Sequence, residues 1–270
     1  MHISSFNTQY GTFMFITRMY AEFNRSNDVC NRYEIDTDGA ALALYFQAQM
    51  PLLFEWSGEI TNFGDEPAPT VLRNDEGARE LHPMQFSLTP PWSKERRVKF
   101  ATNNCRVEDI EKKKTFMGSF SKHRCLVPMS RFREPCYWGE PAGKEVWFEP
   151  AGKEILGAAA IYSLWRSPDR NEELLTMSLL MRPAGQYVME HGHHRQPIFL
   201  EPEGYDVWMQ AGVRESAESK RILREFAIEP EFTWRVTRDM ALSWTKRRKA
   251  KLKNRDDQIA AIEQTGQLGF

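Results

Sequence analysis

Apolar and polar positions along the chain predict many short strands and few helices. Strict apolar–polar alternation indicates a half-buried strand, and a short continuous apolar run indicates a fully buried one. Strands are expected at 32–35, 84–88, 124–127, 146–149, 153–165, 173–181, 198–200 and 233–236. Helices with an apolar face are expected at 38–49, 204–210 and 216–226. Because strands and helices do not alternate regularly, the pattern favours an α+β domain with an antiparallel β core and a few flanking helices, rather than a Rossmann fold.

Turn-forming residues predict how several of these elements are joined. Residues 67–69, which contain two prolines, indicate a loop, as do residues 74–77. Residues 151–152 are Ala-Gly and indicate a turn. We therefore expect the strands at 146–149 and 153–165 to form a hairpin.

The chain divides into three segments. Residues 1–28 have no clear helix or strand period and are expected to be a leader that does not belong to the mature protein. Residues 29–244 form the predicted domain. In the stretch 245–255, seven of eleven residues are Lys or Arg. We interpret 245–270 as a basic, flexible tail, with a nucleic-acid contact as the alternative.

Composition narrows the classes of function. The chain has 270 residues, of which 41% are hydrophobic and 27% are charged, as in a soluble globular protein. No apolar run approaches the ~18 residues that a membrane span requires, so a cytoplasmic protein with no membrane partner is expected. Lys plus Arg is 36 and Asp plus Glu is 37, which gives a net charge of −1. A nucleic-acid site must therefore be a local basic patch, because the protein as a whole cannot coat nucleic acid by charge.

The cysteines and histidines give little support for a metal site. No two cysteines form a C-x-x-C pair, and reduced thiols are expected. His191, His193 and His194 could chelate a metal, but no carboxylate or cysteine stands at ligand spacing. We expect neither a metal nor a cofactor. The four cysteines are Cys30, Cys105, Cys125 and Cys136, of which the last three are most simply core thiols.

Five short motifs follow one another along the chain: Cys30–Tyr33, Phe86–Trp92, Asn104–Glu108, Arg124–Pro128 with Phe132–Pro135, and His193–Pro197. In this order they resemble the SOS response-associated peptidase (SRAP) family, which processes abasic sites. The family opens with Met-Cys-Asn-Arg-Tyr, which Cys30–Tyr33 match after the first residue. Its Trp-Gly-Leu-x-Pro-x-Trp motif is matched loosely by Phe86–Trp92, in which Phe and Ser replace Trp and Gly. The remaining matches are Asn104–Glu108 for Asn-Ala-Arg-x-Glu, Arg124–Pro128 with Phe132–Pro135 for Arg-Cys-Leu-x-Pro with an aromatic and a Glu, and His193 four residues before Pro197. The resemblance covers residues 29 to 240 and implies a single SRAP-type domain with barrel-like sheets.

The resemblance implies covalent capture of abasic sites in single-stranded DNA. In this family the initiating Met is removed and a cysteine becomes the N-terminal residue. Its α-amine attacks the aldehyde of the abasic deoxyribose, and its thiol closes a thiazolidine ring. An N-terminal amine suits this chemistry because its pKa is about 7.7–8.0, against about 10.4 for lysine. The free-base fraction at neutral pH is thus larger by a factor on the order of hundreds.

This sequence departs from the family because Cys30 is internal and has no free α-amine as written. Our first hypothesis is that translation starts at Val29 through a GUG codon read as Met. The second is that the leader is removed by self-cleavage between Val29 and Cys30. If neither holds, the thiazolidine cannot form.

The resemblance also assigns roles to the other candidate site residues, each beside a simpler interpretation. Glu134 would be a general acid and base, which requires a carboxyl with a raised pKa, or else a surface carboxylate. His193 would transfer protons to the deoxyribose, or else be a structural histidine. Asn104 would hydrogen-bond the adduct, or else form an Asx turn. With Cys30, these are the predicted catalytic residues.

The predicted DNA contacts are two arginines and two aromatic residues. Arg32 and Arg106 would hold phosphates, or else form surface salt bridges. Phe86 and Trp92 would stack on bases, or else pack in the core. A basic groove is expected to supply further backbone contacts. Its residues are Lys94, Arg96, Arg97, Lys99, Arg106, Arg131 and Arg133.

Two other functions remain open from the sequence. One is a thiol peptidase, with Cys30 as nucleophile, His193 as base and Glu134 as orienter. The other is a non-catalytic module that binds intact single strands and loses affinity at high salt. In the favoured interpretation the partner is single-stranded DNA with abasic sites, and the protein is expected to be a monomer.

Overall fold

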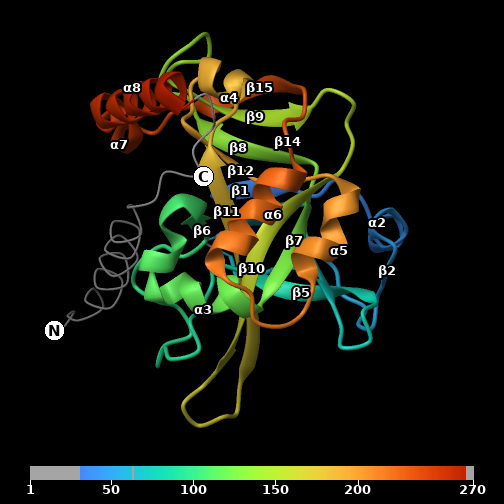
Figure 1. Cartoon of the computed structure of the whole chain (residues 1–270). Coiled ribbons are helices and arrows are strands. Elements are labelled where there is room, and N and C mark those ends of the chain that lie inside the picture. Colours follow the sequence, from blue (N-terminus) through green and yellow to red (C-terminus); the bar gives the residue numbers. More distant parts are fainter. Residues whose placement is uncertain (1–30, 63, 266–270) are drawn as a thin grey trace, which may run out of the picture.

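The computed structural model of the chain describes residues 31–62 and 64–265 (Figure 1). Within them, one sheet has five strands in the order β15-β9-β8-β1-β3, and a second has ten strands along the path β12-β11-β5-β4-β7-β10-β13-β14, with β2 and β6 attached at its side. Most pairings are antiparallel, and the exceptions are β11 with β5, β11 with β6, and β2 with β5. The predicted α+β class with an antiparallel β core is confirmed.

The strands are β1 (Arg32–Glu34), β2 (Ala48–Gln49), β3 (Glu59–Thr61), β4 (Pro67–Arg73), β5 (Arg79–Phe86), β6 (Asn104–Arg106), β7 (Arg124–Met129), β8 (Arg131–Pro135), β9 (Lys144–Pro150), β10 (Leu156–Arg166), β11 (Glu173–Pro183), β12 (Arg195–Pro197), β13 (Phe199–Leu200), β14 (Ala227–Ile228) and β15 (Phe232–Asp239). The helices are α2 (Gly39–Phe46), α3 (Lys114–Lys122), α4 (Gln186–Glu190), α5 (Tyr205–Met209), α6 (Ser216–Phe226), α7 (Leu242–Thr245) and α8 (Arg248–Thr265), with short 3-10 helices η1 (Val107–Lys112) and η2 (Pro202–Gly204). Helices α5 and α6 lie across the ten-stranded sheet (Figure 1).

Aromatic side chains join the two sheets across a shared core. Phe132 of β8 lies 6.0 Å, centroid to centroid, from Phe199 of β13. Tyr33 of β1 meets Phe86 of β5 edge to face at 5.2 Å. All four side chains are buried. Such aromatic pairs stabilise packing by about 0.5–1.5 kcal/mol beyond the area that they bury, so the sheets are held together mainly by these contacts and their aliphatic neighbours.

The helix predictions are close to the observed elements. The helix predicted at 216–226 has those bounds, and the one predicted at 38–49 is α2. Asp38 caps α2, because its side chain accepts a hydrogen bond from the Ala41 backbone N–H at 2.8 Å. The helix ends at Gln47, which adopts the left-handed conformation at φ 50°. None of the helices among the described residues is both long enough and apolar enough to span a bilayer.

The loop predicted at residues 67–69 is wrong, because these residues begin strand β4. Their pairing explains how two prolines fit: Pro67 and Pro69 pair with β5, whereas β7 joins β4 only at Val71. The first part of β4 therefore has a sheet neighbour on one side only. Proline is tolerated there because its missing N–H is not needed by a second strand.

The predicted hairpin at 146–165 is also wrong. β9 pairs with β8 and β15 in the five-stranded sheet, whereas β10 pairs with β7, β11 and β13 in the other. The turn at 151–152 thus carries the chain from one sheet to the other. β10 is apolar on both faces, whereas β9 places Val146 and Phe148 on one face and Glu145 and Trp147 on the other. The pattern therefore indicated that both strands exist but not which strands they pair with.

The segment expected as a flexible tail, 245–270, contains one helix among its described residues, and a second helix ends where the segment begins. Leu242–Thr245 form α7 and Arg248–Thr265 form α8. Both lie at the end of the molecule that carries β9 and α4 (Figure 1). Partly buried Trp244 and Leu252 pack against the core, so at least the first turns of α8 belong to the folded unit.

Candidate active site

The chain enters the site at Asn31, the first described residue. The Asn31 side-chain oxygen accepts a hydrogen bond from Asn103 Nδ2 at 3.0 Å and one from Asn62 Nδ2 at 3.4 Å. Its backbone carbonyl accepts from the Asn62 N–H at 3.2 Å. Cys30, like the predicted leader 1–28, lies outside the described residues, but one peptide bond joins it to this anchored asparagine.

A buried carboxyl and a buried imidazole face each other beside this entry. Glu134 is 1% exposed and lies on β8, one residue after Arg133, which pairs with Arg32 of β1. His193 is 0% exposed and lies in the loop before β12. Its Nδ1 is 3.7 Å from Glu134 Oε2. The structure thus brings together two predicted catalytic residues that are far apart in sequence.

The hydrogen bond of His193 fixes the roles of its ring nitrogens. Nδ1 lies 3.0 Å from the backbone carbonyl oxygen of Arg195. A carbonyl can only accept, so Nδ1 carries a proton in this contact. In the neutral ring Nε2 therefore keeps the lone pair and can take a proton. The Tyr137 ring stacks on His193 with centroids 6.2 Å apart and holds the imidazole in its plane.

A close backbone approach positions the histidine loop. The Tyr137 N–H donates to the Gly192 carbonyl at 2.8 Å. Gly192 has φ 106°, and a Cβ atom there would lie 2.5 Å from the Trp138 carbonyl oxygen. Glycine is required at this position because both the conformation and the space exclude a side chain. The loop that carries His193 is therefore fastened to the end of β8.

The third catalytic prediction, Asn104, begins strand β6. This strand pairs in parallel with β11, where Asn104 lies opposite Leu179. Side chains alternate along a strand, so Asn104 and Arg106 share one face and Cys105 takes the other. Cys105 is buried in the core and Arg106 is exposed. The neighbouring Asn103 binds Asn31, so β6 lies next to the residue that follows Cys30.

The predicted arginine contacts have different outcomes. Arg32 Nη1 is 2.9 Å from Glu59 Oε1, and Arg133 Nη2 shares the same oxygen at 3.2 Å. This supports the salt-bridge interpretation of Arg32. Arg106 is exposed at the site, so its phosphate contact stays a prediction.

The structure favours the core-packing interpretation of Phe86. Phe86 is 1% exposed and its ring packs against Tyr33. Trp92 is 61% exposed, and stacking there stays a prediction. The pattern could not separate the two cases, because both aromatic residues border the same proline-rich turn.

The predicted basic groove is not a free cationic surface. Most of its guanidinium groups are engaged by acids. Arg131 binds Glu34 through two nitrogens, Arg97 pairs with Asp65 at 2.8 Å, and Arg96 pairs with Glu172 at 3.2 Å. Arg133 is buried between Glu59 and Glu145. Lys94 and Lys99 are exposed. Neighbouring carboxylates therefore offset most of the positive charge of the predicted basic groove.

Three cysteines among the described residues are unsuited to nucleophilic work. Cys105, Cys125 and Cys136 are free and buried. Burial raises the pKa of each thiol. These groups stay protonated at neutral pH, and a protonated thiol is a poor nucleophile. The expectation that they are core thiols is confirmed, and Cys30 stays the candidate for sulfur chemistry.

The histidine cluster is arranged for contacts other than metal binding. His191 stacks on Tyr187 at 4.2 Å, and its Nδ1 lies 2.8 Å from the Tyr187 carbonyl. His193 faces Glu134, and the ring of His194 meets His193 edge to face at 4.9 Å. No group of three or more His, Cys, Asp or Glu residues in the part of the chain that the structure describes could hold a metal ion.

Sequence reasoning missed several residues around this pair. Arg195 forms a largely buried ion pair with Glu108, which ties η1 to β12. Tyr137 follows β8 and carries no motif. His194 is buried, and its burial, with the nearby charges of His193, Lys251, Arg195 and Arg106, lowers its pKa far below the ordinary value. The ring of His194 is therefore neutral. The H-x-R spacing of 193–195 was the signal that could have drawn attention to Arg195.

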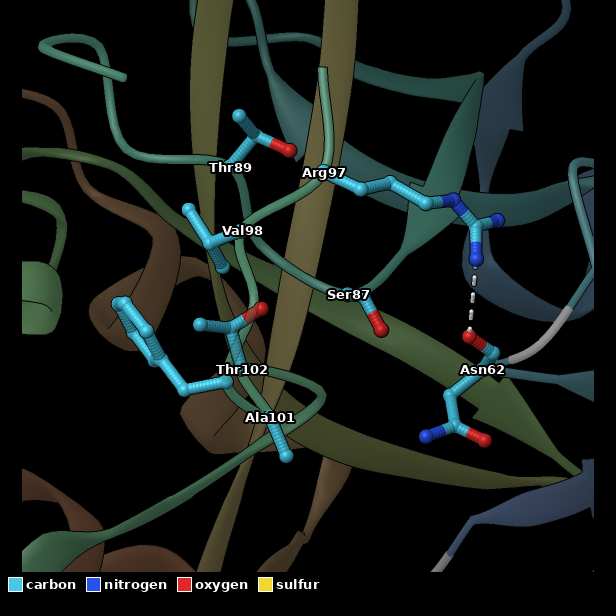
Figure 2. Close-up of a pocket in the computed structure, with 8 residues that line it drawn as sticks. Asn62, Ser87, Thr89, Arg97, Val98, Ala101 and Thr102 are labelled. Atoms are coloured by element: carbon cyan, nitrogen blue, oxygen red, sulfur yellow. Dashed lines mark hydrogen bonds between the residues drawn. The ribbon is translucent and has the colours of Figure 1, made fainter. Parts of the chain in front are cut away.

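A small pocket of about 60 Å³ lies beside Asn62, which binds Asn31 (Figure 2). The Arg97 guanidinium donates to the Asn62 carbonyl at 3.5 Å across it, and Figure 2 shows Ser87 between Thr89 and Asn62. Ser87 has φ 123°, a conformation that favours glycine. The serine that replaces the expected glycine of this motif is therefore strained.

We expect Ser87→Gly to stabilise the fold. A non-glycine residue in such a conformation costs about 1–3 kcal/mol, and glycine loses about 0.4–1 kcal/mol through the unfolded state. The free energy of unfolding should rise by about 1 kcal/mol, measured by chemical denaturation. Ser87→Ala is the matched control because it removes the hydroxyl and keeps the strain. If both variants were equally stable, strain at residue 87 would not be the cause.

Comparison with known proteins supplies the family. Residues 29–241 match the model of the "SOS response associated peptidase (SRAP)" family. The chain belongs to this family. The match begins one residue before Cys30 and includes Asn104, Glu134 and His193, so the site described above lies wholly within the SRAP domain.

Curated relatives of the SRAP domain are named for abasic sites. The "Abasic site processing protein YoqW" of Bacillus subtilis is 26% identical over 148 residues, which are 53% of this chain and 64% of that protein. The "Abasic site processing protein HMCES" of Gallus gallus is 27% identical over 172 residues, 56% of this chain and 51% of that protein. The matches thus span about half to two thirds of the relatives' length.

Solved structures share the fold. A protein from Bacteroides thetaiotaomicron superposes with a TM-score of 0.64 at 20% identity, over 77% of this chain and 92% of that one. A protein from Bordetella bronchiseptica gives a TM-score of 0.63 at 17% identity, over 77% of this chain and all of that one.

Proposed function

We propose that this protein processes abasic sites in single-stranded DNA by covalent capture through Cys30. The observation that carries the proposal is the buried Glu134–His193 pair set against the anchored residue that follows Cys30. Family membership and the names of the relatives support abasic sites as the substrate. A site with one nucleophilic residue at a strand start and a buried acid–base pair beside it suits carbonyl chemistry.

The reaction joins an aldehyde to an amine and a thiol. The Cys30 amine nitrogen attacks C1′ of the ring-opened abasic deoxyribose and forms a carbinolamine. Loss of water gives an imine. The thiol sulfur then adds to the imine carbon, and its proton passes to the nitrogen, which closes a thiazolidine. One water is released overall, and no bond of the DNA backbone breaks.

The buried pair would move the protons of these steps. Glu134 takes a proton from the attacking amine and returns one to the departing hydroxyl of the carbinolamine. His193, whose Nδ1 is held by the Arg195 carbonyl, offers Nε2 for proton transfer to the deoxyribose during ring opening and reversal. General acid–base catalysis of this type contributes about 10²–10⁴-fold to the rate.

The polar residues of β6 would hold the substrate. Asn104 can donate and accept hydrogen bonds and lies on the face of β6 that carries Arg106. Asn104 would bind the ring of the adduct. The exposed guanidinium of Arg106 would bind a phosphate, which positions the strand without reading its sequence.

The proposal requires a free α-amine on Cys30. If translation starts at Val29, removal of the initiating residue supplies it. If the leader is real, hydrolysis of the Val29–Cys30 peptide bond consumes one water and releases residues 1–29. This single cleavage would also account for the word peptidase in the family description.

The test is an intact-mass measurement on two proteins, the full chain and a chain that begins at Cys30. Each is mixed with a single-stranded oligonucleotide that carries one abasic site, and with the same oligonucleotide carrying thymine there. The chain that begins at Cys30 should give a mass equal to protein plus abasic DNA minus one water, and no adduct with thymine. Absence of that adduct would reject covalent capture. Salt-sensitive binding without an adduct would then favour the binding module.

A further inference from the structure

Helix α8 presents two basic side chains to the aromatic residues that follow β8. Lys251 is 8% exposed, and its Nζ lies 5.8 Å from the centre of the Tyr137 ring. Arg255 lies one turn further, with its guanidinium carbon 5.3 Å from the centre of the Trp138 ring. Residues four apart share one face of a helix, so this face of α8 is basic where a docked helix is usually apolar. Such a face indicates a role beyond packing.

The Lys251 side chain reaches the surroundings of the acid–base pair. Tyr137, on which it lies, stacks on His193, and His193 meets His194. Burial lowers the pKa of His194, and the nearby charges of Lys251, Arg195 and Arg106 lower it further. Basic side chains from α8, β12 and β6 thus lie near His194. Arg195 is offset by Glu108, whereas Arg106 is exposed.

His194 is the second observation that points to a ligand. It is 1% exposed, and neither of its ring nitrogens has a hydrogen-bond partner among the described residues. A buried polar group without a partner costs about 1–3 kcal/mol. A neutral imidazole carries one N–H, which can donate to an anion. An anion in this cluster would accept that hydrogen bond and would lie near the positive charges of Lys251 and Arg106.

We propose that Lys251 and His194 form an anion site that binds a phosphodiester group of the DNA strand whose abasic sugar reaches Glu134 and His193. The inference rests on the proposed function, because that function supplies DNA as the ligand. It makes α8, which lies beyond the matched family domain, a part of the nucleic-acid surface. Lys249 lies on the same helix and is exposed, so it serves as an internal control.

The test measures non-covalent binding of a single-stranded oligonucleotide with a tetrahydrofuran abasic analogue, which has no aldehyde. Lys251→Gln should weaken binding about 5–10-fold at low salt. The slope of log K against log salt should become less steep by about 0.7, the value for one phosphate contact on a single strand. Lys249→Gln removes the same charge from the exposed face of α8 and should change affinity less than twofold. Lys251→Arg keeps the charge and should bind within about twofold of the wild type.

Each result decides the proposal. If Lys251→Gln and Lys249→Gln weakened binding equally, the effect would come from the overall charge of the protein, and the proposal would be overturned. A Lys251→Arg variant as weak as Lys251→Gln would assign the loss to packing and overturn it as well. Tighter binding by Lys251→Gln would show that α8 closes the site against DNA. Wild-type binding of the analogue without an adduct on a true abasic site would reject the proposed function while leaving the Lys251 comparison valid.

Discussion

In a chain that begins at residue 30, Cys30→Ser should still form an imine with an abasic site but no heat-stable adduct. The variant keeps the α-amine and replaces the thiol, so the carbinolamine can lose water while the sulfur ring cannot close. Adduct that survives heating should fall to background. Reduction with borohydride should recover it, because reduction converts the imine to a stable amine. Denaturing gel electrophoresis before and after heating measures both fractions.

The matched control keeps the thiol and blocks the amine. A chain that begins at Val29 and carries an acetylated N-terminus leaves only lysine side chains as amines. Their free-base fraction at neutral pH is lower by a factor on the order of hundreds, so adduct formation should fall about 100-fold or more. A fully heat-stable adduct from the Cys30→Ser chain, or an unchanged rate with the amine blocked, would show that the thiazolidine is not the product.

Glu134→Gln should slow adduct formation by about 10²–10⁴-fold, the usual contribution of a general acid–base group. Glutamine has nearly the same shape, so it keeps the volume next to His193 and removes only the capacity to exchange a proton. The rate is measured by quenching mixtures of protein and abasic oligonucleotide at timed intervals. Unfolding is followed in parallel so that a folding defect is not read as a chemical one.

Glu145→Gln is the control for this change. Glu145 is also a buried carboxyl, on the neighbouring strand β9, and it pairs with Arg133 and Arg238. Its replacement leaves these arginines less compensated and should lower stability, with the adduct rate within about threefold of the wild type. If both glutamines slowed the reaction alike, the effect of Glu134 would come from local structure and not from proton transfer.

The order of the motifs made several residues of this site predictable. The burial and the ion-pair partners of the others depend on tertiary packing, which the sequence does not show. The resemblance to the family singled out Glu134, His193 and Asn104, and the structure brings the first two within 3.7 Å of each other. The sequence could not tell Phe86 from Trp92, since burial depends on which strand covers each ring. Nor could it find the carboxylate that neutralises Arg32, because Glu59 reaches it only through the pairing of β1 with β3.

The parts that sequence reasoning missed depend on contacts between distant segments. Lys251 belongs to a stretch whose composition indicated a solvated tail, and only the docking of α8 gives it a place beside Tyr137. His194 stands next to a predicted catalytic residue but takes its character from burial, which no local pattern reports. The start of β4 was predicted to be a loop because it contains two prolines. Those prolines are tolerated in the strand because only β5 pairs with it there.

Because the turn at residues 151–152 carries the chain from one sheet to the other, the site depends on how the two sheets pack together. Glu134 lies on β8 of the five-stranded sheet, and Asn31 leads into β1 of the same sheet. Asn104 lies on β6 of the ten-stranded sheet, and His193 lies in the loop that leads into β12 of that sheet. The distance between the Glu134 carboxyl and the His193 imidazole therefore depends on how the two sheets pack, to which contacts such as Phe132 with Phe199 contribute. A small slip of one layer on the other would separate the carboxyl from the imidazole while every strand stayed paired. Reactivity towards aldehydes should thus decline on warming or in mild denaturant ahead of the loss of secondary structure, and the rate of capture serves as a gauge of sheet alignment.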